Sequence, residues 1–127
     1  MGWIYCNKLS NYEKAEYHYK LAIKFDPKYP ASYINCTYLL VDIGKYNEAK
    51  DLINKSLAEV TGTDRATYYS ELARISEFEG DYRDAFKYYK TAAQFAFNPT
   101  YIENMKVNMK RVKDKMSTFD RLKLKFI

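Results

Sequence analysis

The chain has 127 residues, 47% of them hydrophobic, with four glycines, three prolines and a formal net charge of +5. This length and composition fit one folded domain with its own core and exclude a disordered chain. No stretch approaches the ~20 apolar residues of a membrane span and no signal-peptide pattern opens the chain, so we expect a cytoplasmic protein.

Three copies of a short segment organise the first hundred residues. The copies begin at Ser10, Gly44 and Gly80, and in each a tyrosine is followed three residues later by an alanine. The glycines follow one apolar-periodic stretch and precede another, which predicts helices that end in a left-handed residue. Asn11 and Asp81 stand where a side chain would cap the next helix. The segment therefore predicts helical hairpins with a short turn.

Each hairpin has two complementary stripes. After the turn a small, a bulky and a small residue share one helix face: Ala15, Tyr19, Ala22; Ala49, Ile53, Ser56; and Ala85, Tyr89, Ala92. The helices before the second and third turns carry Tyr33, Cys36, Thr37, Leu40 and Tyr69, Leu72, Ala73, Ser76. Small residues let two helices approach closely, so we expect these stripes to face each other. Cys6 and Cys36 lack the spacing of a zinc or redox site and are interpreted as buried thiols.

The pattern resembles the tetratricopeptide repeat. The resemblance implies an all-α, right-handed superhelical stack of antiparallel helix hairpins, an α-solenoid of about three repeats plus a C-terminal capping helix. It divides one domain, 1–127, into a shortened repeat 1–28 and two further repeats, 29–62 and 63–97. The first copy departs from the family because it begins inside its first helix.

Residues 98–118 are predicted to form a basic amphipathic helix, with a tail to 127. Asn98-Pro99 reads as a cap followed by a first-turn proline. The apolar seam Ile102, Met105, Met109, Val112, Met116 and Phe119 follows. The seam either covers the last repeat or pairs with a second copy as a homodimer. Residues 99–127 hold eight basic and three acidic residues, so the whole net charge lies here. An acidic partner or a membrane surface could use this charge, whereas the lack of interleaved aromatics argues against nucleic acid.

The resemblance also implies a concave surface lined by the first helix of each hairpin. Ile34, Tyr38 and Val41 form an apolar stripe there, flanked by Asn35 and Arg74, although neighbouring repeats could instead bury Ile34 and Val41. The predicted partner-binding residues are Asn7, Lys8, Ile34, Asn35, Tyr38, Val41, Ser70, Arg74 and Glu77.

The expected function is a protein–protein interaction module that binds a peptide or extended segment in this groove. The alternative is a structural or oligomerisation unit, through the tail helix or as the end of a longer repeat array. His18 is the only histidine. No triad, phosphate loop or metal-ligand cluster accompanies it, so we expect no enzyme, metal or cofactor.

Overall fold

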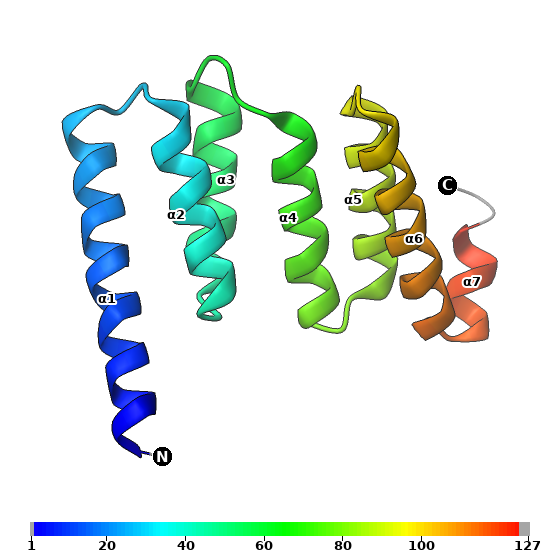
Figure 1. Ribbon diagram of the computed structural model, residues 1–127. Coiled ribbons are helices and arrows are strands. Elements are labelled where there is room, and N and C mark those ends of the chain that lie inside the picture. Colours follow the sequence, from blue (N-terminus) through cyan, green and yellow to red (C-terminus); the bar gives the residue numbers. More distant parts are fainter. Residues whose placement is uncertain (1, 125–127) are drawn as a thin grey trace. The chain divides into compact units, whose positions relative to one another are not determined.

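The computed structural model describes the backbone of residues 2–124 and the side chains of residues 11–122 (Figure 1). The helices are α1 (Gly2–Phe25), α2 (Pro30–Asp42), α3 (Tyr46–Glu59), α4 (Arg65–Phe78), α5 (Tyr82–Phe95), α6 (Pro99–Lys115) and α7 (Thr118–Leu124). Over this range the chain is all-helical without a strand, which confirms the predicted class. None of these helices is long and apolar enough to span a bilayer. The handedness of the stack and the repeat boundaries stay predictions.

The chain divides into two compact units, Met1–Thr63 and Asp64–Ile127. In the first unit, α2 packs against both α1 and α3. The predicted stripe of α2 is buried, with Tyr33, Cys36, Thr37 and Leu40 at most 2% exposed. The Tyr33 hydroxyl donates to the Pro27 carbonyl oxygen at 2.7 Å and so ties the loop before α2 to its core.

The second helices of the hairpins differ in burial. On α3 the predicted stripe Ala49, Ile53 and Ser56 is fully buried. On α1 the matching stripe is only partly covered, because Ala15 and Tyr19 are half-buried and Ala22 is exposed. The small–bulky–small pattern therefore marks the packing face correctly, but the first copy is less enclosed than the second.

The first copy does not contain the predicted turn. The backbone of α1 continues as one helix through Ser10 and Asn11, so Asn11 caps no helix start. The other two copies have Gly44 and Gly80 at this place, with φ of +82° and +80°. A serine carries a Cβ that disfavours the left-handed conformation, so Ser10 does not favour the glycine turn that ends α2 and α4. Over the described residues, Gly2–Phe25 therefore form one helix without a turn at Ser10.

The turn between α4 and α5 shows how a glycine ends a helix here. The Gly80 N–H donates to the Glu77 carbonyl at 3.1 Å, and the Asp81 N–H donates to the Ser76 carbonyl at 2.8 Å. The Asp81 side chain accepts from the Asp84 N–H at 3.3 Å, as predicted for a cap. The turn between α2 and α3 has the same pair of backbone bonds. The last carbonyls of α2 and α4 are therefore satisfied by the turns that follow them, and α5 also has a side-chain cap at its start, which α3 lacks.

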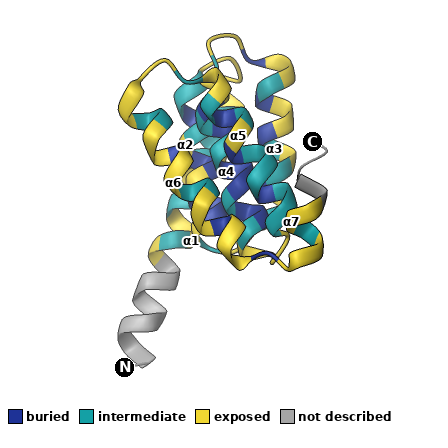
Figure 2. Cartoon of the chain, turned by 90° about the vertical axis from the view of Figure 1, so that its right-hand side faces the viewer, coloured by how far each residue is buried: buried dark blue, intermediate teal, exposed yellow. Residues whose placement is uncertain are grey.

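In the second unit, α5 packs between α4 and α6. Its core joins the small residues of α4 and α5 to the seam of α6 in one cluster: Ala73, Ala85, Tyr89, Ala92, Met105, Val112 and Met116. Figure 2 shows buried segments in dark blue toward the inside of the helices and exposed segments of α6 in yellow. Asn98 caps α6 as predicted, accepting from the Thr100 N–H at 2.8 Å. The apolar seam of α6 thus covers one side of α5.

This packing bears on the predicted homodimer. A dimer through Ile102, Met105, Met109, Val112 and Met116 would need their side chains at the surface. Met105 and Met116 are 6% exposed and Val112 is 0% exposed, because α5 covers them. Ile102 and Met109 are partly exposed. Most of the seam is therefore packed inside the second unit, and the homodimer stays a prediction.

The predicted helix 98–118 corresponds to α6, and the tail that follows it contains a further helix, α7, which the sequence analysis did not predict. α6 ends at Lys115, and α7 begins at Thr118 after a break. Arg121 of α7 donates to the carbonyls of Lys113 and Asp114 at 3.0 and 3.1 Å, so its guanidinium occupies the C-terminal end of α6. Phe119, which was expected to continue the seam, is 64% exposed beyond this break.

Candidate functional site

The predicted binding residues lie on three helices and in both units. Asn7 and Lys8 belong to α1, and their side chains are outside the described residues. The α2 group is Ile34, Asn35, Tyr38 and Val41, and the α4 group is Ser70, Arg74 and Glu77. Because these groups belong to separate units, each is described by itself.

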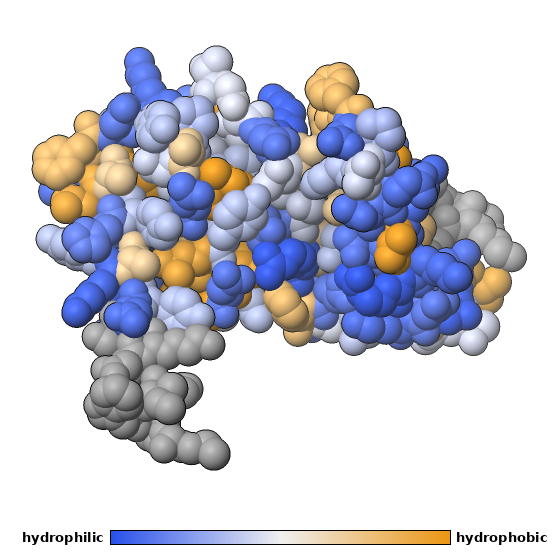
Figure 3. All heavy atoms as spheres, viewed as in Figure 1, coloured by the Kyte–Doolittle hydropathy of each residue, from blue (hydrophilic) through white to orange (hydrophobic). Residues whose placement is uncertain are grey.

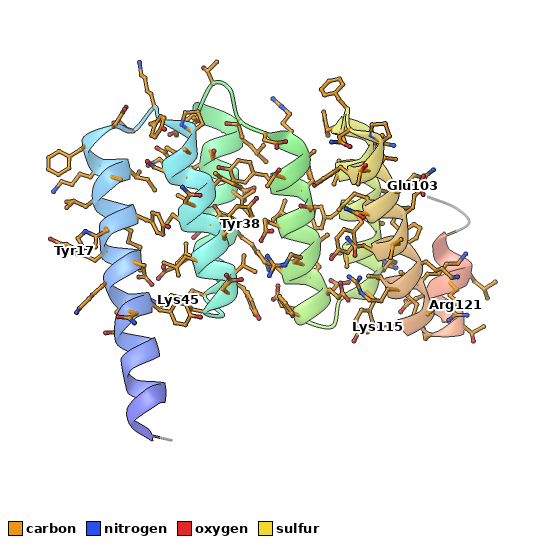
Figure 4. The ribbon with its side chains drawn as sticks, in the orientation of Figure 1. Tyr17, Tyr38, Lys45, Glu103, Lys115 and Arg121 are labelled. Carbon is orange, nitrogen blue, oxygen red and sulfur yellow. The ribbon has the colours of Figure 1, made fainter. Side chains whose placement is uncertain are left out.

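On α2 the predicted apolar stripe is only partly accessible. Tyr38 is 39% exposed and projects from the helix (Figure 4), and Asn35 is exposed beside it. Ile34 is half-buried, and Val41 is 2% exposed. Val41 therefore belongs to the core, and Tyr38 is the main apolar surface that α2 offers.

On α4 the predicted residues come together around a cavity. Ser70, Arg74 and Glu77 are spaced four and three residues apart, so they share one helix face. With Phe78 they line one wall of a cavity of about 330 Å³. The opposite wall is formed by α6, and Tyr89 of α5 lies between the two walls. The α6 residues of this lining are Met105, Asn108 and Arg111.

Arg74 and Phe78 form the accessible rim of this cavity. The Arg74 guanidinium donates to both carboxylate oxygens of Glu71, at 3.0 and 2.8 Å. It also lies 5.8 Å from the centroid of the Phe78 ring, within the range of a cation–π contact. Phe78 is 59% exposed. A charged donor and an apolar ring therefore stand side by side at the entrance.

Glu77 is the electrostatic centre of the cavity and links three helices. Its carboxylate accepts from Arg111 at 2.7 Å, from Lys115 at 2.8 Å and from the Tyr89 hydroxyl at 3.0 Å. The hydrogen bonds from Arg111, and then those from Lys115 and Tyr89, lower the pKa of Glu77 to about 2 despite its burial. Burial, together with the nearby Glu77 charge, raises the pKa of Tyr89 to about 12. Glu77 therefore lines the cavity and also holds α6 against α4.

The sequence did not assign Met105, Asn108 and Arg111 to the binding surface. Met105 was assigned to the seam, and Arg111 only to the basic face. A signal was present, because α4 begins at Arg65 and α6 begins at Pro99, one repeat length of 34 residues later. That spacing gives α6 the position of a further first helix, whose edge borders the cavity beside α4.

A second cavity, of about 290 Å³, lies in the first unit between α1, α2 and α3. Cys36 and Leu40 are part of its lining, and Lys20 and Glu48 close one edge with an ion pair at 3.3 Å. Burial raises the pKa of the Cys36 thiol to about 11, so the thiol stays protonated and is a poor nucleophile. Among the described residues no His, Cys, Asp and Glu group is arranged to hold a metal ion.

Residues 66–99 match the family model of the tetratricopeptide repeat. The match covers most of α4, all of α5 and the first residue of α6. No curated protein matches the sequence significantly. The chain therefore carries a tetratricopeptide repeat, as its third copy predicted, and the usual role of such repeats is to bind other proteins.

Proposed function

We propose that the chain is a protein-interaction module that binds an extended segment of a partner along α4 and α6. The observation that carries this proposal is the cavity lined by Ser70, Arg74 and Phe78 from one side and by Asn108 and Arg111 from the other. Its volume of about 330 Å³ lies at the lower end of the range for ligand pockets, ~300–1,000 Å³. It is suited to one anchoring side chain of a partner.

The lining of the cavity is suited to an apolar side chain of the partner and to the polar backbone groups beside that side chain. Phe78 and Met105 offer apolar surface, while Ser70, Asn108 and Arg74 carry groups that can hydrogen-bond the backbone of a bound segment. An aromatic or arginine side chain in such a pocket commonly supplies most of the binding energy. On α2, in the other unit, Asn35 and Tyr38 remain separate candidate contacts for a partner.

The alternative of a dimerising tail receives no support from the packing of α6. Three of its five seam residues, Met105, Val112 and Met116, are buried within the second unit. The interaction role therefore rests on the cavity and not on self-association.

A peptide-display selection against the whole chain tests the proposal. We expect selected peptides to lose affinity at least about tenfold when Phe78→Ala removes the exposed ring or Arg74→Gln removes the guanidinium charge. Glutamine keeps a donor for Glu71, so the local fold is preserved. Melting curves of both variants check this point.

Matched controls are Phe97→Ala, because Phe97 is 99% exposed in the same unit, and Arg83→Gln on α5. Both should bind the selected peptides like the original chain. Equal affinity of the Phe78, Arg74 and control variants would exclude this cavity as the binding site. A loss seen only with Tyr38→Ala would move the site to α2.

A further inference from the structure

The side of α6 that faces away from the cavity is basic. Lys106, Lys110 and Lys113 are spaced four and three residues apart and are all exposed. Arg111 and Lys115 of the same helix instead bind Glu77. We call the three lysines, with Arg121 of α7, the basic face. It belongs to the segment 99–127 that carries the entire net charge of the chain.

Apolar side chains stand exposed among these charges. Val107 and Phe119 are 64% exposed and Leu122 is 50% exposed. Figure 3 shows hydrophobic side chains as separate spots among hydrophilic ones over α6 and α7. The sequence continues the mixture after Leu122 with Lys123, Leu124, Lys125, Phe126 and Ile127.

We propose that the basic face, together with Val107, Phe119 and Leu122, binds the surface of an anionic lipid membrane. Each lysine or arginine is attracted to anionic headgroups, and exposed apolar side chains can enter the boundary with the acyl chains. The strength of such binding grows with the apolar area that enters the membrane and with the attraction to anionic lipids, so the two signals reinforce each other. The binding is peripheral and leaves the cavity, on another side of α6, open to a protein partner.

The shape of this surface favours a lipid interface over a protein. Val107, Phe119 and Leu122 are exposed and line neither of the two cavities described above. Protruding, separate apolar side chains fit a deformable interface. The predominance of lysine over arginine points the same way, because a lysine acts as a mobile point charge without planar, two-point recognition. Single-stranded RNA would need several aromatic platforms, and Phe119 is the one aromatic side chain in this set.

Vesicle sedimentation of the full chain tests the proposal. We expect the chain to sediment with vesicles that contain phosphatidylserine and to stay in solution with pure phosphatidylcholine. Lys110→Glu with Lys113→Glu should weaken binding by at least about tenfold, because two attractive charges become repulsive. Phe119→Ser with Leu122→Ser should also weaken it by about tenfold, at unchanged charge.

Two matched controls distinguish binding through this surface from effects of the net charge of the chain or of any exposed apolar side chain. Lys14→Glu with Lys24→Glu makes the same charge change at exposed positions of α1, and Phe25→Ser removes a ring that is 79% exposed. Both controls should bind vesicles like the original chain. Equal binding to neutral vesicles, or an equal loss in the controls, would overturn the proposal. The chain is also tested for binding to poly-glutamate and to an RNA oligonucleotide. If the Phe119→Ser, Leu122→Ser variant loses as much affinity for one of these polymers as for vesicles, the surface would be assigned to that polymer instead.

Discussion

The Arg111 guanidinium donates to the Glu77 carboxylate through Nη2 at 2.7 Å and Nε at 3.0 Å, joining residues 34 positions apart. This two-point contact fixes the edge of α6 against α4. Lys115 and Tyr89 bind the same carboxylate, whose side chain is 12% exposed. The α6 wall of the cavity therefore depends on a single acidic residue, Glu77. Its partner Lys115 is labelled in Figure 4.

Glu77→Gln should lower the free energy of unfolding by about 1–2 kcal/mol. The amide keeps the shape of the side chain but loses the charge that Arg111 and Lys115 share, and both cations are nearly half exposed, which limits the cost. Urea denaturation followed by circular dichroism measures it. Glu103→Gln is the control, because its pair with Lys106 is exposed on both sides and should contribute less than about 0.5 kcal/mol. Equal costs for the two variants would contradict a structural role for Glu77.

The same carboxylate predicts an acid-sensitive fold. The pKa of Glu77 is lowered from 4.5 to about 2 in the folded chain, so folding favours its ionised form. The stabilisation is present above pH 4.5 and is lost as pH falls from about 4.5 to about 2. Stability measured across this window should fall more steeply for the original chain than for Glu77→Gln. Parallel pH curves would show that another group is responsible.

The hairpins between α2 and α3 and between α4 and α5 could be predicted because glycine leaves a clear signal. The first copy has the same six-residue pattern with serine in place of glycine. A turn is wrongly predicted there, because the helix runs through Ser10. The contact between Glu77 and Arg111 could not be read from the sequence, since it depends on how α6 is rotated about its axis. The burial of Val41 was likewise undecided, because an apolar residue on a helix edge fits either a core or a surface.

Gly80→Ala should cost about 1–2 kcal/mol of folding stability. Gly80 has a φ of +80°, and no atom lies within 4 Å of an added Cβ, so the cost comes from the backbone conformation alone. Gly80→Asn should cost less, because asparagine tolerates the left-handed region better. Chemical denaturation of the two variants distinguishes them. If the asparagine variant were as unstable as the alanine variant, the loss of stability would come from a side-chain contact at this position and not from backbone strain.

Two valines of α6 test which face of this helix packs against α5. Val112 is 0% exposed and Val107 is 64% exposed, five residues away on the same helix. Val112→Ala removes buried methyl groups and leaves a small cavity, so it should cost about 2 kcal/mol. Val107→Ala should change stability by less than about 0.5 kcal/mol. Thermal melting of the pair checks the rotation of α6, and a reversed order would mean that its seam faces elsewhere.

Cys36 should resist thiol reagents until the first unit unfolds. Its side chain is 1% exposed, and burial raises its pKa from 9.0 to about 11, which lowers the thiolate fraction near pH 8 about a hundredfold. In a Cys6→Ser background, Cys36 is the one cysteine of the sequence and can be followed alone. Its labelling by a disulfide reagent should be at least about a hundredfold slower in buffer than in denaturing urea, because the thiolate is the reacting form. The native rate should keep rising with pH beyond 9. Rapid labelling at pH 8 that is indifferent to urea would mean that the cavity between α1, α2 and α3 opens far enough to expose the thiol.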